Sequence, residues 1–343
     1  MTDKGSRTCR GWASLPPLPA LLSGLALLSA VATVPAAAAD HPVTLGSGPD
    51  TLFATLARPE PAPPGARPAV LLIAGSGPTD RDGNSTIPAV QPATLKLIAQ
   101  ALESAGYVSL RFDKRGIAAS RAAGADESKL RLDTYVDDAV AWTKRLGSEP
   151  GVSCVVILGH SEGALIGALA SAKTPVCGLV SVSGAGRPFD VVVDAQIRAQ
   201  GASAEVLKQV DAVWSELKAG RTVPQIPATH PLFRPSVQPY LTSVLAHPPT
   251  EAIAAVSAPV LILQGQTDLQ VTEEDARNLA AARPGARLVL LPGANHVLKT
   301  APADRAGNLA TYADPTRPLD PAVMPAILAF LNQASPSKPM TSK

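Results

Sequence analysis

The sequence predicts one α/β domain with a mostly parallel β-sheet and helices on both of its faces. Apolar runs of strand length recur along the chain, and segments whose apolar residues have helical spacing stand between them. This alternation indicates parallel strands, which need helices on both faces to exclude water. The 343 residues are 46% hydrophobic and 17% charged, so the chain has enough apolar side chains for one large core.

The alternation can be followed element by element. Strands are expected at residues 69–75, 107–113, 154–158, 179–186, 260–265 and 287–293, after a strand hairpin at 43–58. Helices are expected around residues 95–102, 136–143, 164–172 and 323–332, and from near Thr272. Ligands of such sheets bind at the carboxyl ends of the strands, so functional residues are expected there.

Residues 187–250 interrupt the alternation and are expected to form a small helical insertion. Ser203 is a candidate N-cap for a helix in this insertion. The apolar face of that helix holds Val206, Leu207, Val210, Val213, Trp214 and Leu217. A proline-rich stretch at 224–249 follows. Two roles stay open for the apolar face: a wall over the site, or packing onto the main domain.

The first 39 residues have the pattern of an export signal. Three basic residues precede an apolar segment at 18–34, and the small residues Ala37, Ala38 and Ala39 then stand before Asp40. The pattern predicts cleavage before Asp40 and a periplasmic or secreted protein without a membrane span. An uncleaved membrane anchor is the alternative. The mature domain is expected at residues 40–334, with a flexible tail at 335–343.

Two cysteines remain after the expected cleavage, because Cys9 lies in the signal. Cys154 and Cys177 each open an apolar run, and we interpret these runs as successive parallel strands. The two side chains are therefore expected near each other, either as a disulfide of an exported protein or as two buried thiols. The sequence leaves both open.

Composition argues against several other functions. The net charge is +2, and no long run of Lys or Arg provides the basic stripe of a nucleic-acid-binding protein. The aromatic content of 3% offers no stacking platform for bases or sugars. The five histidines are scattered, and none is paired with cysteine at ligand spacing, so no metal site is expected.

The segment GHSEG, residues 159–163, places a serine between two glycines directly after a buried apolar run. This G-x-S-x-G pattern at a strand-to-helix turn is typical of a nucleophile elbow, in which a strained turn lifts a serine hydroxyl above the sheet. The glycines are expected because side chains at their positions would collide with the flanking strand and helix.

A serine nucleophile needs a base and an acid that orients the base, in the chain order serine, acid, histidine for this architecture. Asp268 follows the run at 260–265, and His296 follows the run at 287–293. We therefore predict the triad Ser161, Asp268 and His296. A turn-capping aspartate and a loop histidine are the alternatives for the last two.

Three other histidines compete with His296 for the role of the base. His160 lies inside the turn, cannot swing back to Ser161, and is interpreted as structural. His230 and His247 each precede a proline in the insertion and are expected to be solvated.

The tetrahedral intermediate needs preorganised N–H donors around its oxyanion. The backbone N–H of Glu162 is one expected donor, and the loop GSGPTDRDGN is expected to supply the other. Ser76 is our first choice in that loop and Gly77 the second, whereas an ordinary tight turn is the alternative. The neighbouring charges Asp80 and Arg81, with Asp82, are expected to hold the loop rigid through internal ion pairs rather than to contact substrate.

Five segments, GSGPTDRDGN, RFDKRGIAAS, GHSEG, QGQTD and ANHVLK, occur in this order. Together they resemble a family of bacterial serine α/β-hydrolases, described as esterases and related to dienelactone hydrolase and to the S9 and S33 peptidases. The resemblance covers about residues 43–332 and implies an α/β-hydrolase fold, ester hydrolysis without a cofactor, and the triad above. One departure is Ala118, where the family usually has glycine.

The expected function is the hydrolysis of small carboxylic esters through an acyl-enzyme on Ser161. A peptidase or acyl-peptide hydrolase with the same triad is the first alternative. A binding module on an inactive scaffold would lack a triad member, and dehalogenation would need a carboxylate in place of Ser161. The natural ester, its acyl chain length and the oligomeric state stay open.

Overall fold

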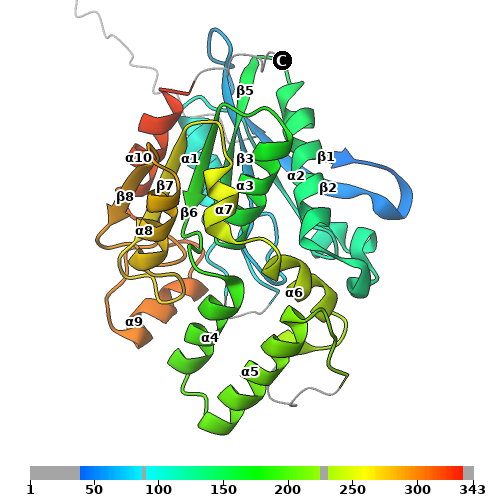
Figure 1. The fold of residues 1–343 in the computed structure, drawn as a ribbon. Helices are drawn as coiled ribbons and strands as arrows, with labels where there is room; N and C mark the ends of the chain where they lie inside the picture. The colour runs from blue at the N-terminus through cyan, green and yellow to red at the C-terminus, as the bar shows by residue number, and fades with distance from the viewer. Residues whose placement is uncertain (1–38, 87–89, 225–230, 335–343) are drawn as a thin grey trace, which may run out of the picture. The chain divides into compact units, whose positions relative to one another are not determined.

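The structure is a computed structural model that describes residues 39–86, 90–224 and 231–334 (Figure 1). The expected signal peptide, apart from Ala39, lies outside the described residues, as do the expected tail and His230. Among the helices of the described ranges, none is both long and apolar enough to cross a membrane.

One eight-stranded sheet has the order β1-β2-β4-β3-β5-β6-β7-β8. The strands are β1 Ala39–Leu45, β2 Leu52–Arg58, β3 Arg67–Ile73, β4 Ser109–Phe112, β5 Val152–His160, β6 Gly178–Val182, β7 Val260–Gly265 and β8 Arg287–Leu291. The pairs β1–β2 and β2–β4 are antiparallel, and the remaining five pairs are parallel. The expected hairpin and the expected mostly parallel sheet are both confirmed.

Helices connect these strands. They are α1 Thr94–Ser104, α2 Leu132–Gly147, α3 Glu162–Lys173, α4 Phe189–Ala199, α5 Ala204–Lys218, α6 Gln238–Leu245, α7 Pro249–Ala254, α8 Glu273–Ala282, α9 Arg305–Ala310 and α10 Val323–Leu331. The helix expected from near Thr272 is α8, and Thr272 caps it in a reciprocal pair of hydrogen bonds with Asp275.

The sheet separates two hydrophobic cores. Along β3, Ala69, Leu71 and Ile73 face the core that includes residues of α2 and α3, whereas Val70 and Leu72 face the core with α1 and α10. Successive side chains of a strand point to opposite faces, so a strand covered on both sides needs apolar residues at every position. This explains the unbroken apolar runs in the sequence.

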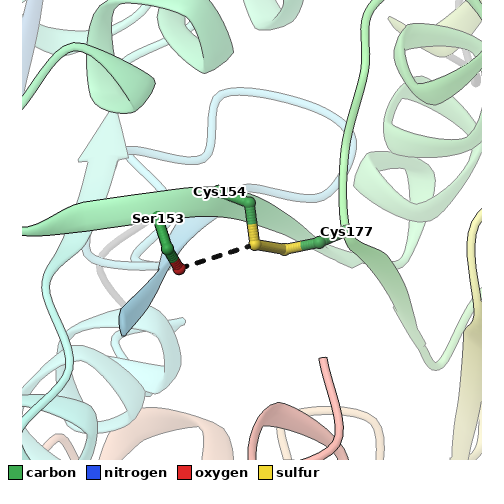
Figure 2. Close-up of a disulfide and its surroundings, with 3 residues drawn as sticks. All are labelled: Ser153, Cys154 and Cys177. Carbon is green, nitrogen blue, oxygen red and sulfur yellow. Dashed lines mark hydrogen bonds between the residues drawn. A yellow bond between two sulfur atoms is a disulfide. The ribbon is translucent and has the colours of Figure 1, made fainter. Parts of the chain in front are cut away.

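A disulfide joins Cys154 of β5 to Cys177, directly before β6 (Figure 2). Their Cα atoms are 6.0 Å apart, and the Cys177 side chain is fully buried. Of the two possibilities that the sequence leaves open, the disulfide is therefore the one observed. It links the amino ends of two adjacent strands, at the end of β5 opposite to Ser161.

The segment that interrupts the alternation is helical, as expected, and Figure 1 shows α4 and α5 below the sheet. Ser203 caps α5 by accepting a hydrogen bond from the Val206 N–H. The apolar face of α5 packs inside the insertion, where the Trp214 ring lies 6.2 Å from the Phe189 ring and 4.8 Å from the Phe233 ring between centroids. The proline-rich stretch also contains a helix, α6, which sequence periodicity did not indicate.

Ala118 adopts a left-handed backbone conformation, with φ of 43°. A side chain in this region costs about 1 kcal/mol or more through contacts of its Cβ with the backbone, and glycine avoids that cost. The departure from the family pattern therefore leaves a strained alanine in a loop whose conformation suits glycine.

Candidate active site

The turn at Ser161 is strained. Ser161 follows β5 directly and precedes α3, and its φ of 56° and ψ of −122° lie in a region that side chains rarely adopt. A Cβ added at Gly159 would lie 2.0 Å from the Gly163 carbonyl oxygen, and one at Gly163 would lie 2.4 Å from the Ile73 carbonyl oxygen. Only glycine fits at both positions, as the sequence pattern predicts.

His296 and Asp268 are hydrogen-bonded. His296 Nδ1 lies 2.8 Å from Asp268 Oδ2, and both side chains are almost fully buried. Asp268 Oδ1 accepts hydrogen bonds from the N–H groups of Gln270 and Val271. Burial alone would raise the pKa of the Asp268 carboxyl, but His296 and these N–H groups together lower it below its ordinary value. The carboxylate is therefore charged and holds the imidazole in the tautomer that leaves Nε2 free.

The elbow and the histidine loop are tied together by His160. Its Nε2 donates to the His296 carbonyl oxygen at 2.8 Å, and the two rings are 4.9 Å apart between centroids. Burial, followed by the charge of His296, lowers the pKa of His160 to about 4, so this ring is neutral. The structural interpretation of His160 is thus confirmed. The Ser161 hydroxyl makes no hydrogen bond to His296 in the described structure, a common situation before substrate binds.

The loop GSGPTDRDGN, residues 75–84, lies against Ser161. A Cβ added at Gly75 would lie 3.1 Å from the Ser161 Cβ, so the absence of a side chain at this position allows the close approach. Within the described residues, the N–H groups of Ser76, Gly77 and Glu162 donate no hydrogen bond to another residue. All three residues line one cavity together with Ser161. Free N–H groups at the start of a helix and in an adjacent loop are suited to an anion.

A buried lysine, which the sequence analysis did not identify, lies behind this loop. Lys114 Nζ donates to the Gly75 carbonyl oxygen at 2.5 Å and lies 3.2 Å from Glu162 Oε2. The Lys114 side chain is 2% exposed and the Glu162 side chain 6%. The sequence could have indicated this residue, because Lys114 follows a predicted strand and therefore lies at the carboxyl edge of the sheet, where functional residues are expected.

The charges of the loop at residues 75–84 form an internal network, as expected. Arg81 Nη2 donates to Asp113 Oδ2 at 2.6 Å, and Arg111 Nε donates to Asp82 Oδ1 at 2.6 Å. Asp80 accepts hydrogen bonds from the Asp82 and Asn84 N–H groups. None of these residues lines the cavity, so their role is to hold the loop.

The cavity above Ser161 has a volume of about 320 Å³. Its wall is mostly apolar: Leu165, Ala185, Phe189, Val192, Val193, Ile197, Leu232, Val244, Pro249 and Val271. The insertion contributes through α4 and also through Leu232, Val244 and Pro249. Of the two roles left open for the α5 face, packing is the one observed, because no residue of α5 lines the cavity. His247, which was expected to be solvated, is half-buried, lines the cavity and lies 3.6 Å from Asp133 Oδ2.

The remaining polar lining residues are Arg187, Gln196, Gln200 and Gln270. Arg187 is already paired, since its Nε and Nη2 donate to the two carboxylate oxygens of Asp275 at 2.9 and 2.7 Å. Among the described residues that line the cavity, Glu162 is the sole carboxylate, and Lys114 neutralises it. No group of three or more His, Cys, Asp or Glu side chains in the described ranges is placed to hold a metal ion.

The sequence is similar to that of a known esterase. Esterase EstD from Thermotoga maritima is 27% identical over 242 residues, which is 68% of this chain and 55% of EstD. The chain thus spans about half the length of this relative.

Two solved structures show the fold. Est1E from Butyrivibrio proteoclasticus, with bound ferulic acid, has a TM-score of 0.54 and 18% identity over 83% of this chain and 99% of its own. Hypothetical protein PA2218 from Pseudomonas aeruginosa has a TM-score of 0.55 and 18% identity over 87% of this chain and 94% of its own.

A family model described as "Serine aminopeptidase, S33" matches residues 93–301, which include all three residues of the predicted triad. The match extends from the start of α1 past the histidine loop and covers more than half of the chain. With its mostly parallel sheet and its strained serine turn, this chain therefore belongs to the serine aminopeptidase S33 family of α/β-hydrolases.

Proposed function

We propose that the protein is a serine hydrolase of small carboxylic esters, with Ser161, His296 and Asp268 as its catalytic triad. The observation that carries the proposal is the buried hydrogen bond between His296 Nδ1 and Asp268 Oδ2, beside a serine on a strained turn. A neutral imidazole with a free Nε2 is the base that a serine hydroxyl needs.

In the proposed reaction, Ser161 Oγ attacks the ester carbonyl carbon while His296 Nε2 takes the hydroxyl proton. The tetrahedral intermediate then breaks its C–O bond to the alcohol, which leaves with the proton from His296. Water next gives a proton to His296 and attacks the acyl-serine. Collapse of the second intermediate releases the carboxylic acid and returns the proton to Ser161.

The oxyanion of each intermediate would accept hydrogen bonds from the Glu162 N–H and from the Ser76 or Gly77 N–H. Support for this assignment comes from their place in one cavity and from the lack of other partners for these donors. A single donor of this kind contributes on the order of a hundredfold to kcat in serine hydrolases.

The cavity favours an uncharged, apolar acyl or alcohol group, because most of its wall is aliphatic. The relative EstD is named an esterase, which supports the same substrate class. The family description favours a second candidate, an aminopeptidase. That activity needs a carboxylate to bind a free α-amino group, and the one carboxylate among the described lining residues is neutralised by Lys114.

The insertion contains five other carboxylates. They are Asp190, Asp194, Glu205, Asp211 and Glu216, and none of them lines the cavity. We therefore expect esters to be preferred over aminoacyl amides.

The test is hydrolysis of p-nitrophenyl acetate, butyrate, octanoate and decanoate beside aminoacyl-anilides, by the wild-type protein and by Ser161→Ala. Ester turnover that disappears in the variant supports the proposal, and the chain-length profile measures the acyl pocket. Faster cleavage of the anilides would establish the aminopeptidase instead. Ester turnover that survives in Ser161→Ala would refute the triad.

We also propose that the protein is exported and cleaved before Asp40. The disulfide between Cys154 and Cys177 supports this location, because such bonds persist in oxidising compartments. Cell fractionation with N-terminal sequencing tests it: a periplasmic or secreted chain that begins at Asp40 is expected, and a cytoplasmic chain with an intact N-terminus would contradict it.

A further inference from the structure

We propose that Lys114 is a positioning residue of the oxyanion hole. Its buried ammonium group orients both N–H donors of the hole. The inference rests on the proposed function. It starts from the two acceptors of Lys114 Nζ, the Gly75 carbonyl oxygen at 2.5 Å and Glu162 Oε2 at 3.2 Å.

The first acceptor belongs to the same peptide group as the Ser76 N–H. In a trans peptide the carbonyl oxygen and the N–H point in opposite directions, so fixing the oxygen also fixes the direction of the hydrogen. A cation at the carbonyl oxygen draws electron density from the amide and makes its N–H a stronger donor. This contact selects Ser76 over Gly77 as the loop's donor, because the carbonyl in the same peptide as the Gly77 N–H accepts from Thr79 instead.

The second acceptor belongs to the residue that carries the other donor. Glu162 is the first residue of α3, and its backbone N–H is free while its carboxylate binds Lys114. One ammonium group is thus bonded to the oxyanion loop and to the start of the nucleophile helix. The distance between the two donors is thereby held by a single side chain.

The ammonium end of this ion pair lies beside buried aromatic rings. Lys114 Nζ lies 5.3 Å from the centre of the Tyr135 ring, and the Tyr240 ring lies 5.5 Å from the Tyr135 ring. Tyr240 comes from α6 of the insertion and is 9% exposed. A charge in such a place is weakly screened, so its effect on the Gly75–Ser76 peptide is larger than it would be at the surface.

A purely structural ion pair predicts a different outcome from a positioning role. Loss of a structural pair lowers stability but leaves kcat of the folded enzyme unchanged. Loss of a positioning group lowers kcat and weakens tetrahedral analogues, whereas KM changes little, because the oxyanion exists only after Ser161 has attacked.

The experiment compares wild type, Lys114→Met, Lys114→Met/Glu162→Gln and Glu149→Gln with p-nitrophenyl butyrate and a trifluoromethyl ketone. The double variant removes both charges, so no unpaired buried charge remains to prevent folding. Glu149→Gln is the matched control, since Glu149 is equally buried, pairs with Arg58 and Arg145, and precedes the amino end of β5.

We expect kcat to fall about 10- to 100-fold in both Lys114 variants, with KM within about threefold and a parallel loss of ketone affinity. Glu149→Gln should keep the wild-type kcat. A kcat within threefold of wild type in the folded double variant overturns the inference while Ser161→Ala still abolishes turnover. If Ser161→Ala remains active, the proposed function itself fails.

Discussion

The disulfide allows a quantitative prediction about stability. It closes a loop with a sequence separation of 23 residues. A cross-link over a loop of this length removes conformational entropy from the unfolded chain worth about 3 kcal/mol at 25 °C. With about 2.1 cal/mol/K of unfolding entropy per residue, a domain of about 300 residues should then lose about 5 °C in Tm when the bond is opened.

Oxidised and reduced wild type should be compared by urea unfolding at pH 7, because reduction opens the bond without removing an atom from the core. Cys154→Ala/Cys177→Ala is the second variant, and it should be less stable than the reduced protein because Cys177 is fully buried. The slope of the unfolding free energy against urea also reports whether the reduced chain unfolds to a more expanded state.

Catalysis should be insensitive to the same change. The bond joins the amino ends of β5 and β6, whereas Ser161 follows the carboxyl end of β5. We expect kcat within about twofold of wild type at 25 °C, where the reduced protein is still folded. A loss of stability below about 1 kcal/mol would refute the loop-entropy argument. A large fall in kcat at 25 °C would refute the expectation that the disulfide does not influence catalysis at Ser161.

Three further predictions follow from single residues. Ala118→Gly should raise the free energy of unfolding by about 1 kcal/mol, because glycine adopts the positive φ of this position without strain. Ala119 has no positive φ, so Ala119→Gly should lower the free energy of unfolding. Urea unfolding of both variants tests this prediction. Asp268→Asn should lower kcat by about 10³- to 10⁴-fold with little change in KM, since an amide holds His296 in the wrong tautomer; a loss below tenfold in p-nitrophenyl butyrate assays contradicts it. The lowered pKa of His160, about 4 against about 6.5 in the unfolded chain, means that the unfolded chain binds a proton first as pH falls. Stability should therefore decline from pH 6.5 toward 4, more steeply in wild type than in His160→Gln, and equal urea midpoint profiles would show that His160 does not titrate as described.

The sheet was predictable because it is covered on both faces. The central strands β3, β5, β6 and β7 had to be apolar at consecutive positions, and the helices between the strands had to show one apolar stripe. The proximity of His296 and Asp268 followed from the same reasoning, since the carboxyl ends of adjacent parallel strands lie together. Periodicity was sufficient to predict the sheet because strand burial is recorded in the local sequence. Chain order was sufficient to predict the proximity of His296 and Asp268 because it follows from the parallel topology.

Other features depend on contacts between distant segments, and periodicity carries no information about them. In the sequence, Lys114 is an ordinary charged residue after a strand. Its burial depends on the ion pair with Glu162, which the fold brings close from 48 residues away. In the insertion, α5 has the clearest apolar face, but that face packs against Phe189 and Phe233. The less regular helix α4 lines the cavity instead.

The insertion contacts the catalytic centre at two places with different consequences. Residues of α4 line the cavity, where they can contact substrate and change which ester binds. Tyr240 of α6 lies behind the elbow. Burial is the largest cause that raises the pKa of Tyr240 above its ordinary value, and the charge of Glu162 is the next largest. Because that same carboxylate binds Lys114, changes at Tyr240 act on the proposed oxyanion donors, whereas Val244 of the same helix lines the cavity. Substitutions in α4 should therefore appear mainly in the substrate profile, and substitutions at Tyr240 mainly in kcat.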